Sequence, residues 1–232
     1  MDLEKLYDEE AGRYDADRLS GSAGKVKHNV EIKKIGKILG KTLGKLDGRR
    51  ILEVGVGTGR IAVELAAKGA TVYGLDVSTK MLEETERKAK ERGVQVRVVK
   101  GSGERLPFRD AQFDAVIIMR VLAHVKAPKK FVEEAKRVTK PGGTLVFDFY
   151  NADNYFIRRG EKRNKEQGKY IPRSFSKKDV VGFLPGVKIE PTQYMLTLGF
   201  LPFHVYYVLE TLLSLLPDRL ARNLIYYYTK EL

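Results

Sequence analysis

From Ile51 onward, short apolar runs alternate with amphipathic stretches, and this alternation constrains the fold more than any other feature of the sequence. Apolar runs of strand length that are separated by helical stretches are typical of a parallel sheet with helical crossovers. We therefore predict strands over residues 50–54, 70–76, 94–99, 113–119 and 144–150, and helices over residues 60–68, 79–92 and 129–139. The last of these helices is predicted to end at Pro141-Gly142-Gly143.

The two flanks of this pattern differ from it. Residues 1–48 predict a helical N-terminal cap with a glycine-containing loop at residues 19–24. Residues 151–232 predict a basic insertion (151–178), a helix (177–184), one or two strands (187–198) and a helical tail (203–232) broken at Pro217. Together with the core of residues 49–150, they predict an α/β protein with a Rossmann-like, doubly wound, mostly parallel seven-stranded sheet and helices on both faces.

Composition narrows the class of protein further. The 232 residues suit one α/β domain with local additions, and the absence of cysteine excludes disulfides, thiolate metal ligands and a cysteine nucleophile. The chain contains no apolar run of about 18 residues, and residues 1–5 lack the pattern of a secretory signal, so we expect a cytoplasmic protein without a membrane span. The net charge of +13 fits either an anionic partner or the Lys- and Glu-rich surface common in heat-adapted proteins.

A glycine-rich turn joins the first predicted strand to its helix. Glycines at positions 55, 57 and 59 let the backbone turn sharply and approach a ligand with no Cβ in the way. Glu53 ends the strand before this turn, and Asp76 ends the second strand, where a carboxylate can accept hydrogen bonds from both hydroxyls of a ribose. The alternatives are a solvated strand-end charge for Glu53 and a helix N-terminal acid near Ser78 for Asp76.

Five motifs in this order resemble the class I S-adenosylmethionine-dependent methyltransferases, in particular the small-molecule enzymes related to the ubiquinone and menaquinone methyltransferases. Residues 53–59 match the family's E-x-G-x-G-x-G, Asp76 matches its ribose acid, and residues 101–108 resemble its G-D-A-E-x-L-P-F. Phe113-Asp114 with residues 121–125, and then residues 137–143, complete the series. The resemblance is strong over residues 45–150 and loose in both flanks.

The resemblance implies S-adenosylmethionine as cofactor, bound by residues 49–150, and no metal site. Ser102 stands where the family usually has an aspartate that accepts a hydrogen bond from the adenine amino group. A hydroxyl accepts without charge assistance, so we expect binding to rely more on Asp76. Tyr14 lies in an element like the family's N-terminal Y-D, or it anchors the N-terminal helix. The predicted cofactor-binding residues are Tyr14, Glu53, Gly55, Gly57, Thr58, Gly59, Asp76, Val77, Met81, Ser102, Gly103, Glu104, Met119 and Arg120.

The resemblance further implies an enzyme that transfers a methyl group by in-line displacement to a small molecule. Positioning of the nucleophile is the main requirement, and a base is needed only if the nucleophile arrives protonated. The candidate catalytic residues are His124, which packs the core in the alternative interpretation, His28, which is a base or a surface residue, and Tyr14. His204 would reach the methyl group only if the tail folds back.

The acceptor itself stays open. The apolar residues 200–216 predict either a lid over a hydrophobic acceptor, such as a quinone or lipid precursor, or packing that includes a homodimer contact through the C-terminal helices. The basic stretch 158–178 favours a rival, an RNA methyltransferase in which Tyr155, Phe156 and Tyr170 stack on bases. A third interpretation is a non-catalytic S-adenosylmethionine-binding protein.

Overall fold

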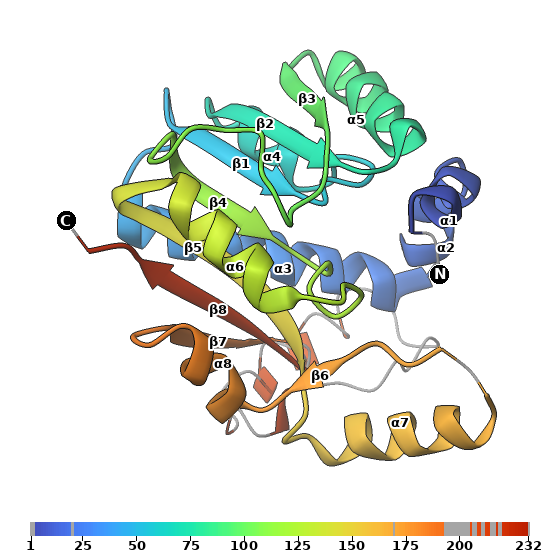
Figure 1. Ribbon diagram of the computed structural model, residues 1–232. Helices are drawn as coiled ribbons and strands as arrows, with labels where there is room; N and C mark the ends of the chain where they lie inside the picture. Colours follow the sequence, from blue (N-terminus) through green and yellow to red (C-terminus); the bar gives the residue numbers. More distant parts are fainter. Residues whose placement is uncertain are drawn as a thin grey trace.

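The computed structural model describes residues 3–19, 21–168, 170–192 and 220–231, with a few positions between 205 and 217. It confirms the predicted α/β fold: a mostly parallel, mixed sheet with helices on both faces (Figure 1). The strands are β1 Arg50–Val54, β2 Thr71–Asp76, β3 Val96–Lys100, β4 Phe113–Ile118, β5 Thr139–Asn151, β6 Ser174–Phe175, β7 Lys188–Thr192 and β8 Asn223–Thr229. The helices are α1 Leu3–Glu10, α2 Tyr14–Leu19, α3 Gly21–Leu43, α4 Ala62–Ala66, α5 Thr79–Arg92, α6 Pro128–Val138, α7 Tyr155–Glu166 and α8 Lys177–Phe183.

The strand order places a switch point in the middle of the sheet. The order is β3-β2-β1-β4-β5-β8-β7, with the short β6 paired to the end of β5. Strands β1 to β5 are parallel to one another, whereas β8 is antiparallel to both β5 and β7. From β1 the chain proceeds outward through β2 and β3, and then returns to β4 on the other side of β1. Ligands of open α/β sheets bind beyond the carboxyl ends of the strands at such a reversal, here at β1 and β4.

Two hydrophobic cores cover the two faces of the sheet. One contains α3, α4 and α5, and its central contacts include Ile51 and Ile117. The other contains α6 and α8, and it includes Leu52 and Val116. Neighbouring residues on β1 and on β4 therefore point to opposite cores, which explains why the strand sequences are apolar throughout instead of alternating.

Local sequence signals determine where helix α5, which begins next to Asp76, starts and ends. The Ser78 hydroxyl accepts a hydrogen bond from Met81 N and caps α5, and Gly93 ends the helix with a φ of 71°. Strand β1 and helix α5 coincide with the residues that the sequence predicts. Helix α8 confirms the helix expected from residue 177.

The region around Pro141 corrects the predicted start of the fifth strand. The sequence predicts a turn at Pro141-Gly142-Gly143 with the strand following it, but β5 begins at Thr139 and passes through these residues. The pairing of β4 with β5 shifts register between Phe113 and Ala115, so the segment forms an irregularity inside the ladder. Gly142 has a φ of 74°, a conformation that costs glycine little, which is why this sequence can bend within a strand.

Two predictions in the flanks are wrong. The loop expected at residues 19–24 is largely absent, because α3 already begins at Gly21. The helical tail is contradicted over Asn223–Thr229, which forms β8 between β5 and β7. Its apolar and aromatic residues are buried on both faces, and a short run of this kind fits a central strand as well as a helix. Residues 193–204 and most of residues 205–219, including His204, lie outside the described residues.

The basic insertion forms one helix and a return segment. Helix α7 has no buried residue, and it lies apart from the sheet in Figure 1. The chain then returns through residues 170–173 to β6. Among the described residues, no helix combines the length and the apolar character needed to cross a membrane.

Candidate functional site

The glycine turn brings the loops after β1 and β4 together. Gly55, Gly57 and Gly59 all have positive φ values, between 53° and 75°. A Cβ on Gly55 would overlap the side chain of Val121, and one on Gly59 would lie 2.9 Å from Thr85 of α5. Gly55 thus lets the loop after β4 approach the turn, whereas Gly59 lets α5 pack behind it.

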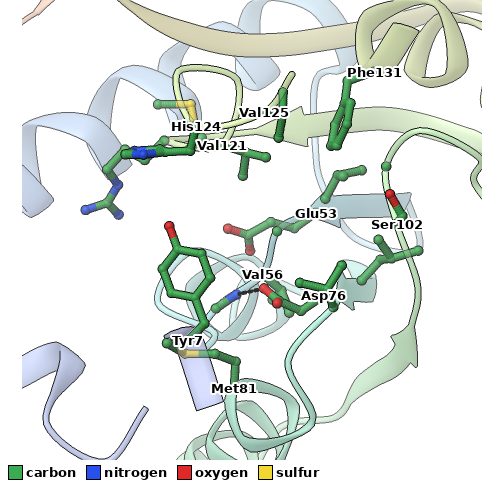
Figure 2. Close-up of a pocket in the computed structure, with 18 of the residues that line it drawn as sticks. Tyr7, Glu53, Val56, Asp76, Met81, Ser102, Val121, His124, Val125 and Phe131 are labelled. Carbon is green, nitrogen blue, oxygen red and sulfur yellow. Dashed lines mark hydrogen bonds between the residues drawn. The ribbon is translucent and has the colours of Figure 1, made fainter. Parts of the chain in front are cut away.

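A cavity of about 500 Å³ opens at this point. Figure 2 shows Val121, His124, Val125 and Phe131 on one side of it, and Val56, Asp76 and Met81 on the other. Every predicted cofactor-binding residue except Gly59 lines the cavity. The structure thus brings together residues from four strand ends and from the N-terminal cap.

Asp76 is held rigidly at the end of β2. Its Oδ2 accepts a hydrogen bond from Gly57 N at 2.9 Å (Figure 2), and its Oδ1 accepts one from Ser78 N at 3.0 Å. Burial raises the pKa of this carboxyl, while the backbone N–H groups oppose that rise. Each carboxylate oxygen has a second acceptor position, so the orientation that the backbone fixes leaves capacity for ligand hydroxyls.

Glu53 is a buried acid at the end of β1. Its side chain is 3% exposed, and its Oε2 has no hydrogen-bond partner among the described residues. Burial raises the pKa of Glu53 to about 8, in spite of the nearby Arg120. A buried carboxyl oxygen without a partner in this position favours a cationic ligand group, because a cation would stabilise the ionised form.

Arg60 provides the opposite charge on the same cavity. Its Nε and one Nη are buried and lack hydrogen-bond partners among the described residues. Burial and the neighbouring Arg120 lower the pKa of this guanidinium. An acidic group and a guanidinium, both with unused hydrogen-bonding atoms, thus line one cavity, and together they suit a ligand with one cationic and one anionic end.

Arg120 follows β4 in a strained backbone conformation, and both its backbone N–H and its guanidinium have partners. It has a φ of 61°, which non-glycine residues rarely adopt. Its backbone N–H donates to Oδ1 of Asp148 at 2.6 Å, and its guanidinium lies 3.5 Å from Glu31 of α3. Asp148 is buried, which raises its pKa to about 6, and it also accepts a hydrogen bond from Asn223 of β8.

The N-terminal helices cover the cavity through two Tyr-Asp pairs. Tyr7 and Tyr14 both line the cavity, with their rings edge to face at 6.3 Å. The aspartate after each tyrosine bonds to the rim. Asp8 accepts from the Ser78 hydroxyl at 2.6 Å, and Asp15 accepts from the Thr58 hydroxyl at 2.6 Å and pairs with Lys88 of α5.

The histidines occupy different environments. His124 lines the cavity, and its Nδ1 lies 3.1 Å from the hydroxyl of Tyr170. His28 is on α3 and is not among the residues that line the cavity. Burial and the charges of Arg60 and Arg120 lower the pKa of His28 to about 4, so it is neutral at physiological pH.

Sequence reasoning missed several residues that line the cavity. Tyr7 had a detectable signal, because Tyr7-Asp8 repeats the Tyr14-Asp15 pair seven positions earlier. Arg60 directly follows the glycine turn, but the pattern indicated only the beginning of a helix. Tyr170 follows an insertion with no periodicity that would direct it to the cavity, so no sequence signal could have placed it there.

Comparisons with known proteins assign the core. Residues 52–147 match the family model described as a methyltransferase domain. An uncharacterised protein of Methanocaldococcus jannaschii is 38% identical over 136 residues, which is 58% of this chain and 62% of that protein. A ubiquinone biosynthesis O-methyltransferase of Paracidovorax citrulli is 40% identical over 129 residues, 53% of this chain and 52% of that enzyme. The chain thus spans less than two thirds of the length of these relatives.

Solved structures agree with the fold over nearly the whole chain. A magnesium protoporphyrin IX methyltransferase of Synechocystis, with S-adenosylhomocysteine bound, has a TM-score of 0.70 at 19% identity and covers 99% of this chain and 100% of its own. An S-adenosylmethionine-dependent methyltransferase of Thermotoga maritima gives the same TM-score at 22% identity, covering 98% of this chain and 99% of its own. These findings show that residues 52–147 match a methyltransferase domain and that nearly the whole chain has the fold of S-adenosylmethionine-dependent methyltransferases.

Proposed function

We propose that this protein transfers the methyl group of S-adenosylmethionine to a small molecule with an apolar body. The observation that carries the proposal is the pair formed by Glu53 and Arg60, each with buried polar atoms that lack partners on the cavity. The methionine part of the cofactor is a zwitterion, and its ammonium and carboxylate match this acid and this guanidinium in charge. The residues present therefore fit the cofactor.

The rest of the cavity fits the nucleoside. Asp76, held by Gly57 N and Ser78 N, would accept hydrogen bonds from the ribose hydroxyls. Val77, Met81 and the segment Ser102–Gly103 also line the cavity, and we expect them to enclose the adenine. The Ser102 hydroxyl already accepts from Glu104 N at 3.2 Å, and it retains one acceptor position for the adenine amino group.

Methyl transfer requires little covalent chemistry from the protein. When bound, S-adenosylmethionine supplies an electrophilic methyl carbon whose bond to sulfur breaks with its electron pair going to sulfur. The chain has to align an acceptor with that carbon and exclude water, and alignment of this kind supplies up to about 7–11 kcal/mol in well-oriented reactions. The two Tyr-Asp pairs of the N-terminal cap would provide the exclusion of water.

The apolar wall supports a hydrophobic acceptor. Val121, Val125 and Phe131 lie across the cavity from Asp76 and Met81 in Figure 2, and His124 adds a polar group beside them. The curated relative named above is an O-methyltransferase of ubiquinone biosynthesis, which supports an acceptor with an apolar ring and a hydroxyl group.

Calorimetry and label transfer test this proposal. We expect S-adenosylmethionine and S-adenosylhomocysteine to bind the protein with micromolar or tighter dissociation constants, and Glu53→Gln and Arg60→Gln each to weaken binding at least tenfold. Arg50→Gln, an exposed substitution at the opposite end of β1, is the matched control and should bind normally. Incubation with methyl-labelled cofactor and a small-molecule metabolite extract should yield a labelled product. Tight binding without any transfer would favour a non-catalytic binding protein.

RNA is the rival acceptor, and one structural detail weighs against it. Helix α7 exposes Tyr155 and Phe156, but Tyr170, the third aromatic residue expected to stack on bases, is stacked on His124. With labelled cofactor and total RNA, we expect at most binding that disappears with added salt, and no methyl transfer. Transfer of label to RNA would overturn the small-molecule proposal.

A further inference from the structure

The loop after β4 and the insertion meet at the cavity through one pair of side chains. His124 comes from the turn beyond the carboxyl end of β4, and Tyr170 comes from the segment that returns from α7 to β6. His124 Nδ1 and the Tyr170 hydroxyl lie 3.1 Å apart, and the rings are stacked with an interplanar angle of 18°. Both residues line the cavity.

Backbone contacts hold the two segments together around this pair. Arg173 N donates to Ala123 O at 2.8 Å, and the Arg173 guanidinium donates to Lys126 O at 2.8 Å. Arg173, three positions after Tyr170, thus anchors the insertion to the backbone on both sides of His124. Since α7 buries none of its own residues, this anchored segment fixes where the insertion meets the site.

The pair lies on the acceptor side of the cavity. His124 is next to Val121 and across the cavity from Asp76 and Met81 (Figure 2). The proposed cofactor contacts use neither His124 nor Tyr170. Burial and the charge of Arg18 on α2 lower the pKa of His124, so its imidazole is neutral at physiological pH and one ring nitrogen is free of a proton.

Resting on the proposed function, we propose that Tyr170 is a positioning residue for acceptor activation. Its phenolic oxygen accepts a hydrogen bond from Nδ1–H of His124, which leaves Nε2 unprotonated to take the proton of a hydroxyl-bearing acceptor. The acceptor oxygen then forms its bond to the methyl carbon, and the proton passes from Nε2 to water. Tyr170 is half-exposed as a residue. Its hydroxyl can act as donor and acceptor at once, so its oxygen can accept from His124 while its own proton is donated elsewhere.

The tautomer of His124 tests this hydrogen bond directly. Nitrogen-15 NMR of the full chain saturated with S-adenosylhomocysteine resolves the two ring nitrogens, and the chain has only three histidines. The His124→Asn variant assigns the signals. We expect His124 to be protonated at Nδ1 in the wild type and to shift toward the Nε2–H form in Tyr170→Phe, which removes the hydroxyl and keeps the stacked ring. An Nε2–H form in the wild type, or no change in Tyr170→Phe, would overturn the proposal.

Activity provides the second readout. Label transfer from S-adenosylmethionine into a metabolite extract should fall about tenfold in Tyr170→Phe. This loss is smaller than the roughly 10²–10⁴-fold contributed by a general base, because Tyr170 orients the base and is not the base itself. The dissociation constant of S-adenosylhomocysteine should stay within about twofold, which also reports that the variant folds. Tyr155→Phe, the same change at an exposed tyrosine of the insertion, is the control and should leave both values unchanged.

The two hypotheses fail in different ways. If the cofactor binds but no variant transfers label, the proposed function and the proton-accepting role of His124 are both wrong, while the NMR result still decides whether Tyr170 orients His124. If transfer is normal in Tyr170→Phe, the proposed function survives and the positioning role of Tyr170 does not.

Discussion

At the scale of single residues, this site depends on polar groups whose charge states are set by burial. Glu53 and Asp148 are almost fully buried, and burial raises the pKa of each. Burial raises the pKa of Asp76 as well, but two backbone N–H groups bind its carboxylate and oppose that rise. The carboxyl ends of β1 and β2 thus present two different acids. Asp76 is already oriented by backbone hydrogen bonds, whereas Oε2 of Glu53 has no hydrogen-bond partner among the described residues.

The pH dependence of stability should report the state of Glu53. The pKa of Glu53 in the folded protein is about 8, above its usual value of 4.5, so between these values the folded protein retains a proton that the unfolded chain has released. Stability from this group is therefore lost progressively as the pH rises from about 4.5 to about 8. Melting temperatures between about pH 5 and pH 8 should fall more steeply in the free protein than with S-adenosylhomocysteine, whose ammonium would pair with the ionised carboxylate. An unchanged profile in Glu53→Gln would contradict this assignment.

Ser102 is a second residue with a measurable consequence. An aspartate there would offer the adenine amino group a charged acceptor, and charge-assisted hydrogen bonds are stronger than neutral ones. Calorimetry should show that Ser102→Asp binds S-adenosylmethionine about three- to tenfold more tightly. Ser102→Asn, which has the same shape without the charge, should stay near the wild-type affinity. Equal affinities for all three proteins would mean that Ser102 does not contact the adenine.

At the scale of secondary-structure elements, the sequence predicts what local signals determine. Helix α5 was placed correctly because Ser78 caps it and Gly93 ends it. Strand β8 was missed because its apolar residues, Leu224 to Tyr228, have no period that separates a strand from a helix, and only pairing with β5 and β7 decides the matter. The glycine turn could be recognised because its residue spacing is a local signal. The position of Tyr170 depends on how the insertion folds back, so the sequence could not predict it.

The N-terminal cap yields a prediction for α2. Asp15 bonds the Thr58 hydroxyl of the glycine turn and pairs with Lys88, so Asp15→Asn should loosen the cap over the cavity. We expect S-adenosylmethionine to dissociate faster and to bind about three- to tenfold more weakly, a modest change because the ion pair is partly exposed to solvent. Stopped-flow and calorimetric measurements would show it. Asp17→Asn, on the same helix and exposed, is the matched control; an equal loss in both variants would exclude a specific role for Asp15.

At the scale of the whole molecule, β8 joins the cofactor-binding half of the sheet to its far edge. It pairs with β5 over Thr144–Tyr150 and with β7 over Lys188–Thr192. Tyr226 lies at the centre of this junction, fully buried, with its ring stacked on Phe147 at 5.5 Å. Asn223 reaches Asp148, which in turn holds the backbone of Arg120 at the cavity.

Removing the Tyr226 ring should therefore weaken the entire fold. Tyr226→Ala is expected to lower the free energy of unfolding by about 3–5 kcal/mol, the range for truncating a large buried aromatic side chain. Chemical denaturation followed by circular dichroism measures this change. Tyr155→Ala removes an exposed ring and should change stability by less than about 0.5 kcal/mol. A similar small effect at Tyr226 would mean that β8 contributes little to the core.

The position of β8 also has a consequence for how the chain folds during synthesis. Among the described strands, β7 pairs only with β8, which also covers the edge of the largely apolar strand β5. While the ribosome is still adding the residues between Asn151 and Asn223, that edge has no partner, and β7 has nowhere to dock. We expect the nascent chain to form β1 to β5 first and to depend on chaperones or rapid translation until residues 223–229 emerge and complete the sheet.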